Sequence, residues 1–365
     1  MIDNIVLLIP SLNPDKKLIR TVEGMIAAGF TKILVVNDGS NSFHRWPFEE
    51  IAGFGEVTCI GYEENKGKGH ALKYGFKYIL ENYDNVAGVL TADGDGQHMP
   101  ADCINVANEM LAKNECVFGC RDFSDPSVPR RNKMGNKISI FAYNFLCEIK
   151  MSDTQTGLRA IPVRYLKEFI DVEGERFEYE TNTLIYMKNH DMPFNEVKID
   201  TVYESDSNEG SHFRVVEDSI RIYKPLIKAG GPRFLLFTLG SLLATLIDLA
   251  IFTVLTHLIA RTSEEFLAII ASVFIATYTA RFFSALFDYY FSLKFVFNKN
   301  KNLKKGGLLR YFVLMLAQAG VSAALVAVIC FIFGITGVVR TAIKIVIDTC
   351  LFFVGYRIQR EWVFK

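Results

Sequence analysis

The chain has 365 residues, 50% of them hydrophobic, and its 40 basic and 40 acidic residues give a formal net charge of zero. Acidic residues predominate before Arg233 and basic residues after it. Because the later basic residues flank long apolar runs instead of covering a polar face, nucleic acid is excluded as a partner and a membrane-facing second part is favoured. The length predicts about two domains.

Predicted strands and helices alternate in the first part. Residues 1–10 form one strand-length run without the basic start and cleavage site of a signal peptide, so we expect none. The βαβ pattern predicts an α/β domain with a mostly parallel sheet and helices on both faces. Strands are expected at 5–9, 32–36, 57–61, 87–91 and 116–119, and helices from about Asp15, over 68–82 and over 101–111.

Polar, glycine-rich segments follow three of these strands, at 10–13, 37–40 and 93–98. Ligands bind at such strand ends in open α/β sheets. In the last segment, Asp93 and Asp95 alternate with glycines, and Gln97 adds a neutral oxygen. These oxygens suit Mg²⁺ or Mn²⁺ bridging a diphosphate, which predicts a nucleotide-sugar site. An acidic Asx turn without a ligand is the alternative that this segment alone leaves open.

Four apolar runs in the second part are long enough to cross a bilayer, which takes roughly 20 residues. Basic residues gather between the second and third runs and outside the first and fourth, which places both termini in the cytoplasm. We therefore expect a multi-pass protein of the cytoplasmic membrane, in contact with the lipid bilayer. Seven cysteines without a CxxC pair fit a reducing compartment. The spans are expected at 234–259, 266–290, 308–333 and 338–356.

Charged residues inside these runs are expected to be paired or functional, because each costs about 2.5 to 3.5 kcal/mol to insert. We expect a polar seam that includes Asp248, Arg281, Lys344 and Asp348. Lys344 and Asp348 lie four apart on one helical face, where an ion pair is the simpler reading. Asp248 has no partner in its own run, and Arg281 is the candidate.

The second part also shows a faint internal repeat. Arg233-Phe234 opens the first pair of runs and Arg310-Tyr311 the second, and each pair closes with a tyrosine and an aromatic cluster. A duplicated two-helix unit explains this pattern, as in many transporter folds. Basic and aromatic residues that mark every membrane interface explain it equally well.

Several segments in order carry a family resemblance: 9–13 (IPSLN), 35–40 (VVNDGS), 65–71 (NKGKGHA) and 93–98 (DGDGQH), continued by 119–121, 130–131 and 153–159. They resemble the motifs of family 2 GT-A glycosyltransferases, in particular the polyprenyl-phosphate branch with dolichol-phosphate mannose synthase and bactoprenol glucosyltransferases. The second part resembles the GtrA-like four-helix proteins, implicated in moving lipid-linked sugars across membranes. The resemblance implies a cytoplasmic GT-A domain with interfacial helices over 1–225 and a GtrA-like membrane domain over 226–365.

The resemblance implies an inverting, metal-dependent transfer of a hexose from a nucleotide-sugar, either a UDP-hexose or GDP-mannose, to a polyprenyl phosphate. The second pKa of a phosphate monoester is about 6, so this acceptor needs no general base. It does need cations. Whether the membrane domain translocates the product and whether the chain forms a homo-oligomer stay open.

Site residues follow from the resemblance together with the chemistry. The metal ligands are expected to be Asp93, Asp95 and Gln97. The nucleotide-sugar contacts are expected to be Pro10, Leu12, Asn37, Asp38, Lys68, Asp93, Gly94 and Asp95. The catalytic residues are expected to be Asp95 and three cations for the acceptor phosphate, namely Arg121, Arg131 and His212. The family often has Asp where this chain has Asn37, which leaves the base open.

Other roles are less sharply defined by the sequence. Lys68 opens a helix, where its charge and the helix-terminus amides are expected to contact phosphate. Glu178 and Glu180 lie near the general base of family members that glycosylate hydroxyl groups, and they fit either a structural helix start or a positioning role. Two other functions compete with lipid glycosylation. One is a processive polysaccharide synthase, and the other is a lipid-linked sugar transporter with an inert transferase domain.

Overall fold

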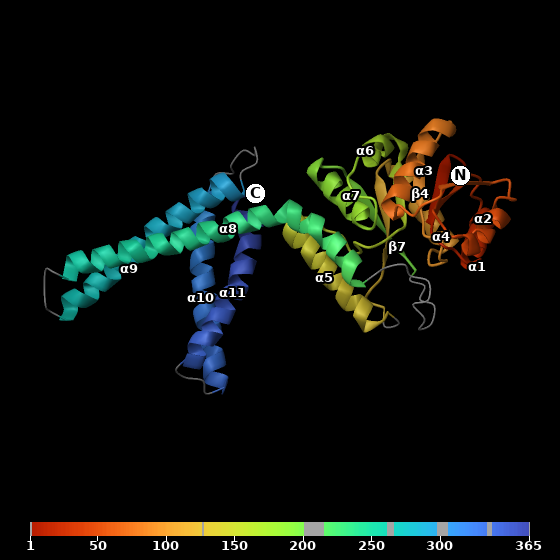
Figure 1. The fold of residues 1–365 in the computed structure, drawn as a ribbon. Helices are drawn as coiled ribbons and strands as arrows, with labels where there is room; N and C mark the ends of the chain where they lie inside the picture. Colours follow the sequence, from red (N-terminus) through yellow and green to blue (C-terminus); the bar gives the residue numbers. More distant parts are fainter. Residues whose placement is uncertain are drawn as a thin grey trace. The chain divides into compact units, whose positions relative to one another are not determined.

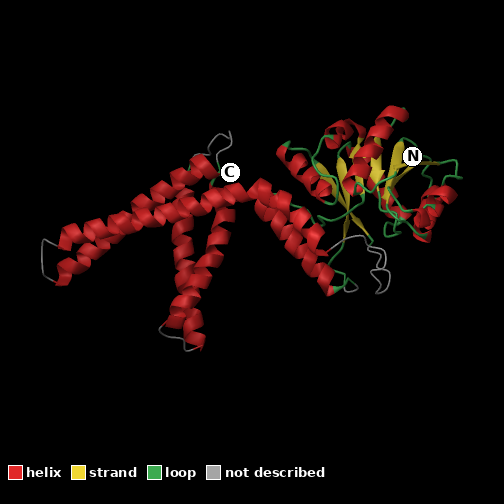
Figure 2. Ribbon diagram, viewed as in Figure 1, coloured by secondary structure: helices red, strands yellow, loops and turns green. Residues whose placement is uncertain are grey.

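A computed structural model describes residues 2–125, 128–200, 215–260, 266–297, 306–333 and 338–364 of the chain. The chain divides into two compact units, Met1–Ala229 and Gly230–Lys365. The first is an α/β unit, and the described residues of the second form helices (Figure 2).

The first unit contains one seven-stranded sheet with the strand order β3-β2-β1-β4-β6-β5-β7. β6 runs antiparallel to both of its neighbours, and the remaining neighbouring pairs are parallel. The mostly parallel α/β sheet predicted from the sequence is therefore confirmed. The strands are β1 (Ile5–Ser11), β2 (Ile33–Asp38), β3 (Val57–Tyr62), β4 (Gly88–Thr91), β5 (Cys116–Arg121), β6 (Arg159–Pro162) and β7 (Phe194–Ile199).

Helices cover both faces of this sheet (Figure 1). On one face α1, α2 and α4 pack against the strands, and on the other α3, α5, α6 and α7 do so. Asp15 caps α1 by accepting a hydrogen bond from the Lys17 amide, so this helix begins where the sequence predicts. The helices are α1 (Lys16–Ala27), α2 (Trp46–Ile51), α3 (Lys68–Asn82), α4 (Pro100–Lys113), α5 (Arg130–Cys147), α6 (Leu166–Ile170) and α7 (Glu178–Asn189).

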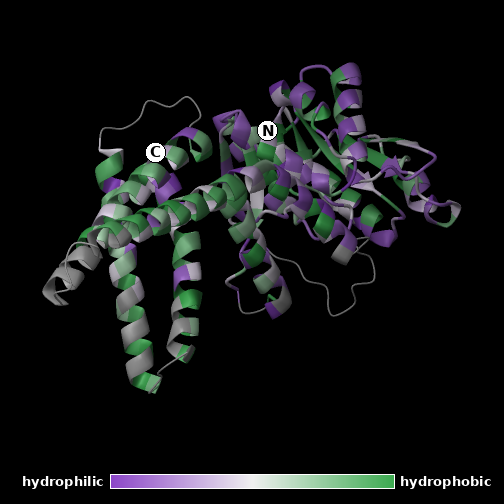
Figure 3. Ribbon diagram, turned by 60° about the vertical axis from the view of Figure 1, so that its left-hand side comes forward, coloured by the Kyte–Doolittle hydropathy of each residue, from purple (hydrophilic) through white to green (hydrophobic). Residues whose placement is uncertain are grey.

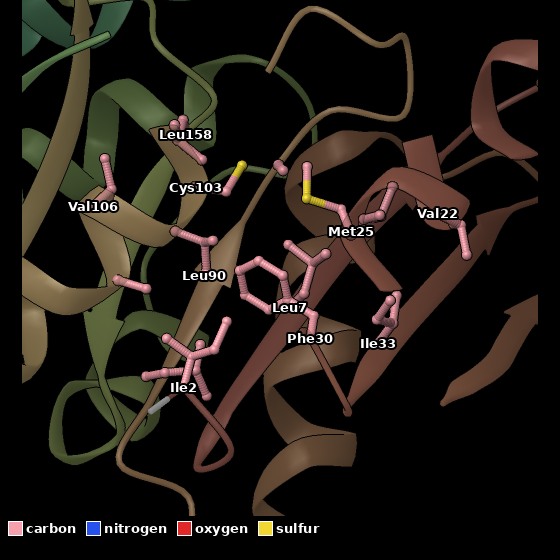
Figure 4. Close-up of a cluster of buried hydrophobic side chains, with 14 of the residues drawn as sticks. Ile2, Leu7, Val22, Met25, Phe30, Ile33, Leu90, Cys103, Val106 and Leu158 are labelled. Carbon is pink, nitrogen blue, oxygen red and sulfur yellow. The ribbon is translucent and has the colours of Figure 1, made fainter. Parts of the chain in front are cut away.

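The central strands are apolar on both sides because each side faces a helix layer. Figure 4 shows one of these layers, in which Leu7, Ile33 and Leu90 of the sheet meet Met25 of α1 and Val106 of α4. All five side chains are fully buried. This core fixes the backbone from which the polar strand ends emerge.

The cysteines of the first unit contribute to the cores and not to chemistry. Burial raises the pKa of Cys103, Cys116 and Cys120 to about 12, so these thiols stay protonated at neutral pH. They behave as small apolar residues, as the sequence predicts.

In the second unit, helices cover the four apolar runs predicted from the sequence. Hydrophobic residues recur along the coloured parts of these helices (Figure 3), and side chains such as Leu242, Leu246 and Leu249 are about 60% exposed. Among the described residues, one segment, Glu217–Leu255, combines the length and mean hydropathy (2.1) of a membrane span. The helices are α8 (Val215–Ala260), whose first residues belong to the first unit, α9 (Phe266–Phe291), α10 (Gly307–Phe333) and α11 (Val338–Ile358). The π-helices η3 (Ser292–Val296) and η4 (Gln359–Val363) follow α9 and α11.

Ring contacts in this unit reveal an approximate two-fold repeat. Tyr289 and Tyr356 stand at the same distance in sequence before η3 and η4, and Phe297 and Phe364 directly follow these π-helices. Each tyrosine ring contacts the phenylalanine of the other half, stacked for Tyr289–Phe364 (centroid distance 5.4 Å) and tilted for Tyr356–Phe297 (5.7 Å). The two phenylalanines stack on each other at 4.9 Å. Such crossed contacts favour a duplicated two-helix unit over separate interface markers.

Candidate active site

Three polar segments meet at the carboxyl ends of β1, β2 and β4. The close approach depends on Gly94, where a Cβ atom would lie 3.3 Å from Cγ2 of Ile9 in β1 and 3.0 Å from Cδ1 of Leu18 in α1. Parallel neighbours place their carboxyl ends on one edge, so the order β2-β1-β4 brings these segments together.

The segments after β1 and β2 are joined by hydrogen bonds. The Asn13 amide donates to Oγ of Ser40 (2.8 Å), and the Ser40 amide donates to Oδ1 of Asn37 (2.8 Å). Pro10 lies near the end of β1 and Leu12 directly after it, and both are half-buried. These expected nucleotide contacts thus share one rim of the site.

Asp38 is buried and accepts hydrogen bonds from the loop that follows β3. Its carboxylate accepts from the Tyr62 hydroxyl (2.7 Å), the Asn65 side-chain amide (3.0 Å) and the backbone amides of Lys66 (2.9 Å) and Gly67 (3.0 Å). In this geometry Asp38 orders the loop that carries Lys68. Its direct contact with a nucleotide stays a prediction.

Two backbone amides at the start of α3 form hydrogen bonds within the protein. The Gly67 amide donates to Asp38, and the His70 amide donates to the carbonyl of Glu175 (2.9 Å). Contact of the Lys68 side chain and of the other first-turn amides with phosphate stays a prediction.

The Lys68 ammonium group bridges two carboxylates, 2.8 Å from Oδ1 of Asp93 and 3.3 Å from Oε1 of Glu180. Burial alone would lower the pKa of Lys68, but these two carboxylates outweigh it and raise the pKa above its ordinary value. Lys68 is therefore a permanent cation in the site.

Asp93 is surrounded by groups that favour its charged form. Lys68 contacts one of its oxygens, and Nε2 of His98 lies 3.5 Å from the other. Burial opposes ionisation, but Lys68 and His98 prevail and hold the pKa of Asp93 well below its usual range. Gly157 passes so close that a Cβ atom there would lie 2.3 Å from Oδ2 of Asp93.

Asp95 lies in a less favourable environment. Burial, and then the charge of Asp93, raise its pKa, although its Oδ1 accepts a hydrogen bond from the Gln97 amide (3.1 Å). Two neighbouring carboxylates that repel each other gain stability from a bound cation. Gln97 is exposed beside them.

The donor set fits a hard divalent cation such as Mg²⁺ or Mn²⁺, which prefers carboxylate and amide oxygens. Asp93, Asp95 and Gln97 supply such oxygens from one turn. Both ring nitrogens of the buried His98 lack a hydrogen bond in the described structure. Within the described ranges, no group of three or more His, Cys, Asp or Glu residues is placed to hold a metal. The expected set of metal ligands therefore includes the side-chain oxygen of Gln97 as its third member.

Of the three cations expected to bind the acceptor, the structure describes the side chain of Arg121. It forms a two-point ion pair with the buried Asp153, with Nε 2.7 Å from Oδ2 and an Nη nitrogen 3.2 Å from Oδ1. The Arg131 backbone lies in the first turn of α5, but its side chain is outside the described structure, and so is all of His212.

Helix α5 presents two different faces. Met134, Ile138 and Phe141 are each more than half exposed, and the sequence of this helix contains basic but no acidic residues. On the opposite face, the Asn136 side chain donates to the Ser152 carbonyl (3.0 Å). That face therefore holds the segment that carries the partner of Arg121.

Two sequence families match this chain. The profile of Glycosyl transferase family 2 matches residues 6–170, and that of the GtrA/DPMS transmembrane domain matches residues 236–364. The chain is a family 2 glycosyltransferase. Its first unit carries the transferase fold, and its second unit carries the GtrA/DPMS domain.

Individual relatives and solved structures also resemble this chain. A protein of Methanocaldococcus jannaschii described as uncharacterized is 30% identical over 207 residues, which cover 55% of this chain and 82% of the relative. The glycosyltransferase AglJ of Haloferax volcanii is 24% identical over 277 residues, which cover 74% and 87% of the two chains. Among solved structures, glucosyl-3-phosphoglycerate synthase from Mycobacterium tuberculosis with Mn²⁺ and UDP has 13% identity and a TM-score of 0.47, over 62% of this chain and 80% of that one.

The GtrA/DPMS domain of this glycosyltransferase contains the predicted charge pair between α8 and α9. Arg281 lies 3.4 Å from Asp248, which also accepts a hydrogen bond from Ser284 (3.2 Å). In the other half, Asp348 of α11 accepts a hydrogen bond from Ser322 of α10. The Lys344 side chain is outside the described structure, so its pairing with Asp348 stays a prediction.

Four residues near the two aspartates received no definite role from the sequence: His98, Gly157, Arg159 and Glu180. Arg159 is buried on β6, with one Nη nitrogen 3.7 Å from Oε1 of Glu180 and its Nε donating to the Thr156 carbonyl (3.0 Å). The motif around residues 153–159 pointed to this segment, but only the antiparallel placement of β6 beside β4 brings it to Asp93.

Proposed function

We propose that this glycosyltransferase transfers a hexose from a UDP- or GDP-sugar to a polyprenyl phosphate, with inversion and with Mg²⁺ or Mn²⁺. The observation that carries the proposal is the pair Asp93 and Asp95 at the carboxyl end of β4, with Lys68 beside it. Further support comes from the residues on the donor side and on the acceptor side.

On the donor side, Asp93, Asp95 and Gln97 would hold the cation, which when bound stabilises the negative charge of the departing nucleoside diphosphate. Lys68 adds a fixed positive charge at the same place. The rim formed by Pro10, Leu12, Asn37 and Asp38 would hold the base and ribose.

On the acceptor side, the state of Glu180 supports a phosphate over a hydroxyl group. The Oε1 atom of Glu180 contacts Lys68 and Arg159, so the protein uses this carboxylate to hold two cations and not to face a hydroxyl acceptor. A phosphate monoester is already ionised at neutral pH and attacks without a general base. Arg121, which is paired with Asp153, is a candidate for binding such an anion, and so are Arg131 and His212.

Helix α5 supports a lipid acceptor. Its exposed apolar stripe (Met134, Ile138 and Phe141) and its basic residues are the pattern of a helix that lies on an anionic membrane surface. We propose that this stripe contacts the bilayer and that the two termini and the transferase unit are cytoplasmic, with four membrane spans. The domain boundary near residue 225 and self-association belong to the same proposal as untested expectations.

A processive polysaccharide synthase is a weaker alternative. Such enzymes carry Gln-x-x-Arg-Trp before their channel helices, whereas Gln359-Arg360-Glu361-Trp362 has different spacing and lies in η4, after the last predicted span. A transporter with an inert transferase unit is disfavoured by the complete set of Asp93, Asp95 and Lys68.

The experiment that tests the proposal supplies membranes carrying the full chain with labelled UDP- and GDP-sugars and analyses the extracted lipid. We expect one labelled sugar in a polyprenyl monophosphate, and a β-linkage by NMR coupling from an α-linked donor, since single displacement inverts the anomeric centre. A lipid diphosphate, a polysaccharide or an α-linked product would contradict the proposal.

A further inference from the structure

Glu180 and Lys68 come together because the first turns of two helices meet. Gly69 of α3 packs against Tyr179 of α7, where a Cβ atom on residue 69 would lie 2.5 Å from Cβ of Tyr179. α7 is in turn anchored by the Tyr179 hydroxyl, which donates to the Phe169 carbonyl (2.8 Å). This contact brings Oε1 of Glu180 to 3.3 Å from the Lys68 ammonium group.

Lys68 therefore has two carboxylate partners, of which one is an expected metal ligand and the other is not. Asp93 is the one expected to bind a divalent cation, and a cation there competes with the Lys68 ammonium group for the same oxygens. Glu180 lies outside the expected metal ligands and keeps its contact with Lys68. A lysine with one remaining carboxylate partner can leave Asp93 without becoming an unpaired, largely buried charge.

The charges of the site agree with such an exchange. Lys68 contacts Asp93 and Glu180, Arg159 contacts Glu180, and Asp95 follows Asp93 in the same turn. These three carboxylates and two fixed cations leave one net negative charge. A divalent cation reverses that sign, and the site then complements a diphosphate.

We propose that Glu180 is a positioning residue for Lys68: it tethers the ammonium group so that Lys68 releases Asp93 to the metal and turns to the donor diphosphate. This inference rests on the proposed function. It assigns Glu180 a role on the donor side, through Lys68, and none in activating the acceptor.

The test measures binding by the full-length protein in detergent, with Mn²⁺ alone and then with UDP or GDP in the presence of Mn²⁺. Lys68→Gln and Glu180→Gln should each weaken nucleotide binding about tenfold or more, the usual effect of losing a charged partner. The double variant should be no weaker than the poorer single variant, because both changes remove one linked interaction.

Binding of Mn²⁺ alone provides a readout that general structural damage would not produce. Lys68→Gln should tighten Mn²⁺ binding because it frees Asp93, whereas Glu180→Gln should weaken it because Lys68 then has only Asp93. Glu180→Asp keeps the charge but shortens the reach, and it should behave like Glu180→Gln. It carries the same test if Glu180→Gln does not fold by circular dichroism. The matched control Glu173→Gln removes the same charge from a side chain that is 85% exposed, and it should bind like the wild type.

Additive losses in the double variant, wild-type binding by Glu180→Asp, or an equal loss in Glu173→Gln would each overturn the tether while leaving the proposed function intact. A wild-type protein that binds neither UDP nor GDP with Mn²⁺ would overturn the proposed function, and the tether with it.

Discussion

Gly157 leaves the space that the carboxylate of Asp93 occupies: a Cβ atom on residue 157 would lie 2.3 Å from Oδ2 of Asp93. The peptide there is fixed, since the Thr91 hydroxyl donates to the Gly157 carbonyl (2.8 Å). The Asp93 side chain is held too, by the Lys68 ammonium group at 2.8 Å, and His98 lies 3.5 Å from its other oxygen. Gly157, which precedes β6, therefore limits the orientation of the Asp93 side chain, which follows β4.

We expect Gly157→Ala to lower transfer at least tenfold while the melting temperature changes little. The new methyl group displaces the end of one side chain and not the core, so function suffers more than stability. Gly55→Ala is the matched control, because nothing lies within 4 Å of a Cβ atom there, and it should retain wild-type activity. Equal activity of the two variants would show that the position of Asp93 does not matter.

Asp95→Asn should abolish nearly all transfer and leave the protein folded and in the membrane. The change removes a charge that burial and Asp93 make unfavourable in the absence of a cation, so thermal stability without metal should be equal or higher. Transfer assays and thermal melts of the same preparation measure both effects. Near-normal turnover of the variant, or full wild-type activity in excess EDTA, would refute a metal at this position.

The first five strands of the chain and the position of the two aspartates after β4 could be predicted from the sequence because they depend on local apolar runs and turns. The antiparallel strand β6 could not, since Arg159–Pro162 is a short apolar run whose direction is set by its neighbours β4 and β5. Its placement is what brings Gly157 and Arg159 to the site.

The partners of Lys68 were equally hidden from the sequence. Lys68 and Glu180 are far apart along the chain, and no periodic pattern links them; the contact depends on how α3 packs against α7. The same holds for the bonds of Asp38, whose motif indicated a nucleotide contact while its described partners are a tyrosine, an asparagine and two backbone amides.

The environment of Glu175 predicts that the stability of the fold falls in acid. Burial alone would raise its pKa, but hydrogen bonds from Lys73 (2.5 Å) and His70 (2.6 Å) prevail and lower it. A lowered pKa in the folded state stabilises the fold above the unfolded value of about 4.3, and this contribution is lost as the pH falls through the folded value. Glu175 is half exposed, so the contribution should be below about 1 kcal/mol.

Amide hydrogen exchange in α3 measures this effect locally. At pH 7, Glu175→Gln should exchange faster than the wild type in the first turns of α3, because the tie to His70 and Lys73 is weaker. The difference should shrink as the pH falls below about 4. A difference that persists or grows in acid would contradict the assigned sign.

The exposed stripe of α5 predicts that variants of this stripe lower transfer to a membrane-bound acceptor but not to a water-soluble one. The double variant Ile138→Ser, Phe141→Ser should lower transfer to a long polyprenyl phosphate in bilayers more than tenfold, since each buried apolar side chain contributes about 1.5 to 3 kcal/mol. Transfer to a short, water-soluble prenyl phosphate should not change. Trp46→Ser, at an exposed aromatic residue of α2, is the control. Equal losses with both acceptors would indicate damage to the site and no membrane contact.

Variants of Asp248 and Arg281 distinguish two roles of the second unit, a membrane anchor and a translocator of the lipid-linked sugar. In a simple anchor the pair is an insertion cost of about 2.5 to 3.5 kcal/mol per charge, and neutral replacements should be mild or stabilising. In a polar seam for a lipid-linked sugar, the exposed Arg281 side chain, 3.4 Å from Asp248, offers a charge to the head group. Asp248→Asn and Arg281→Gln should then leave synthesis on the cytoplasmic face intact and lower the appearance of product on the other face.

Sealed proteoliposomes with labelled lipid-linked sugar, probed from outside by a membrane-impermeant glycosidase, measure this movement, with Arg357→Gln as a control outside the pair. Equal movement in the wild type, both variants and protein-free vesicles would reduce the second unit to an anchor.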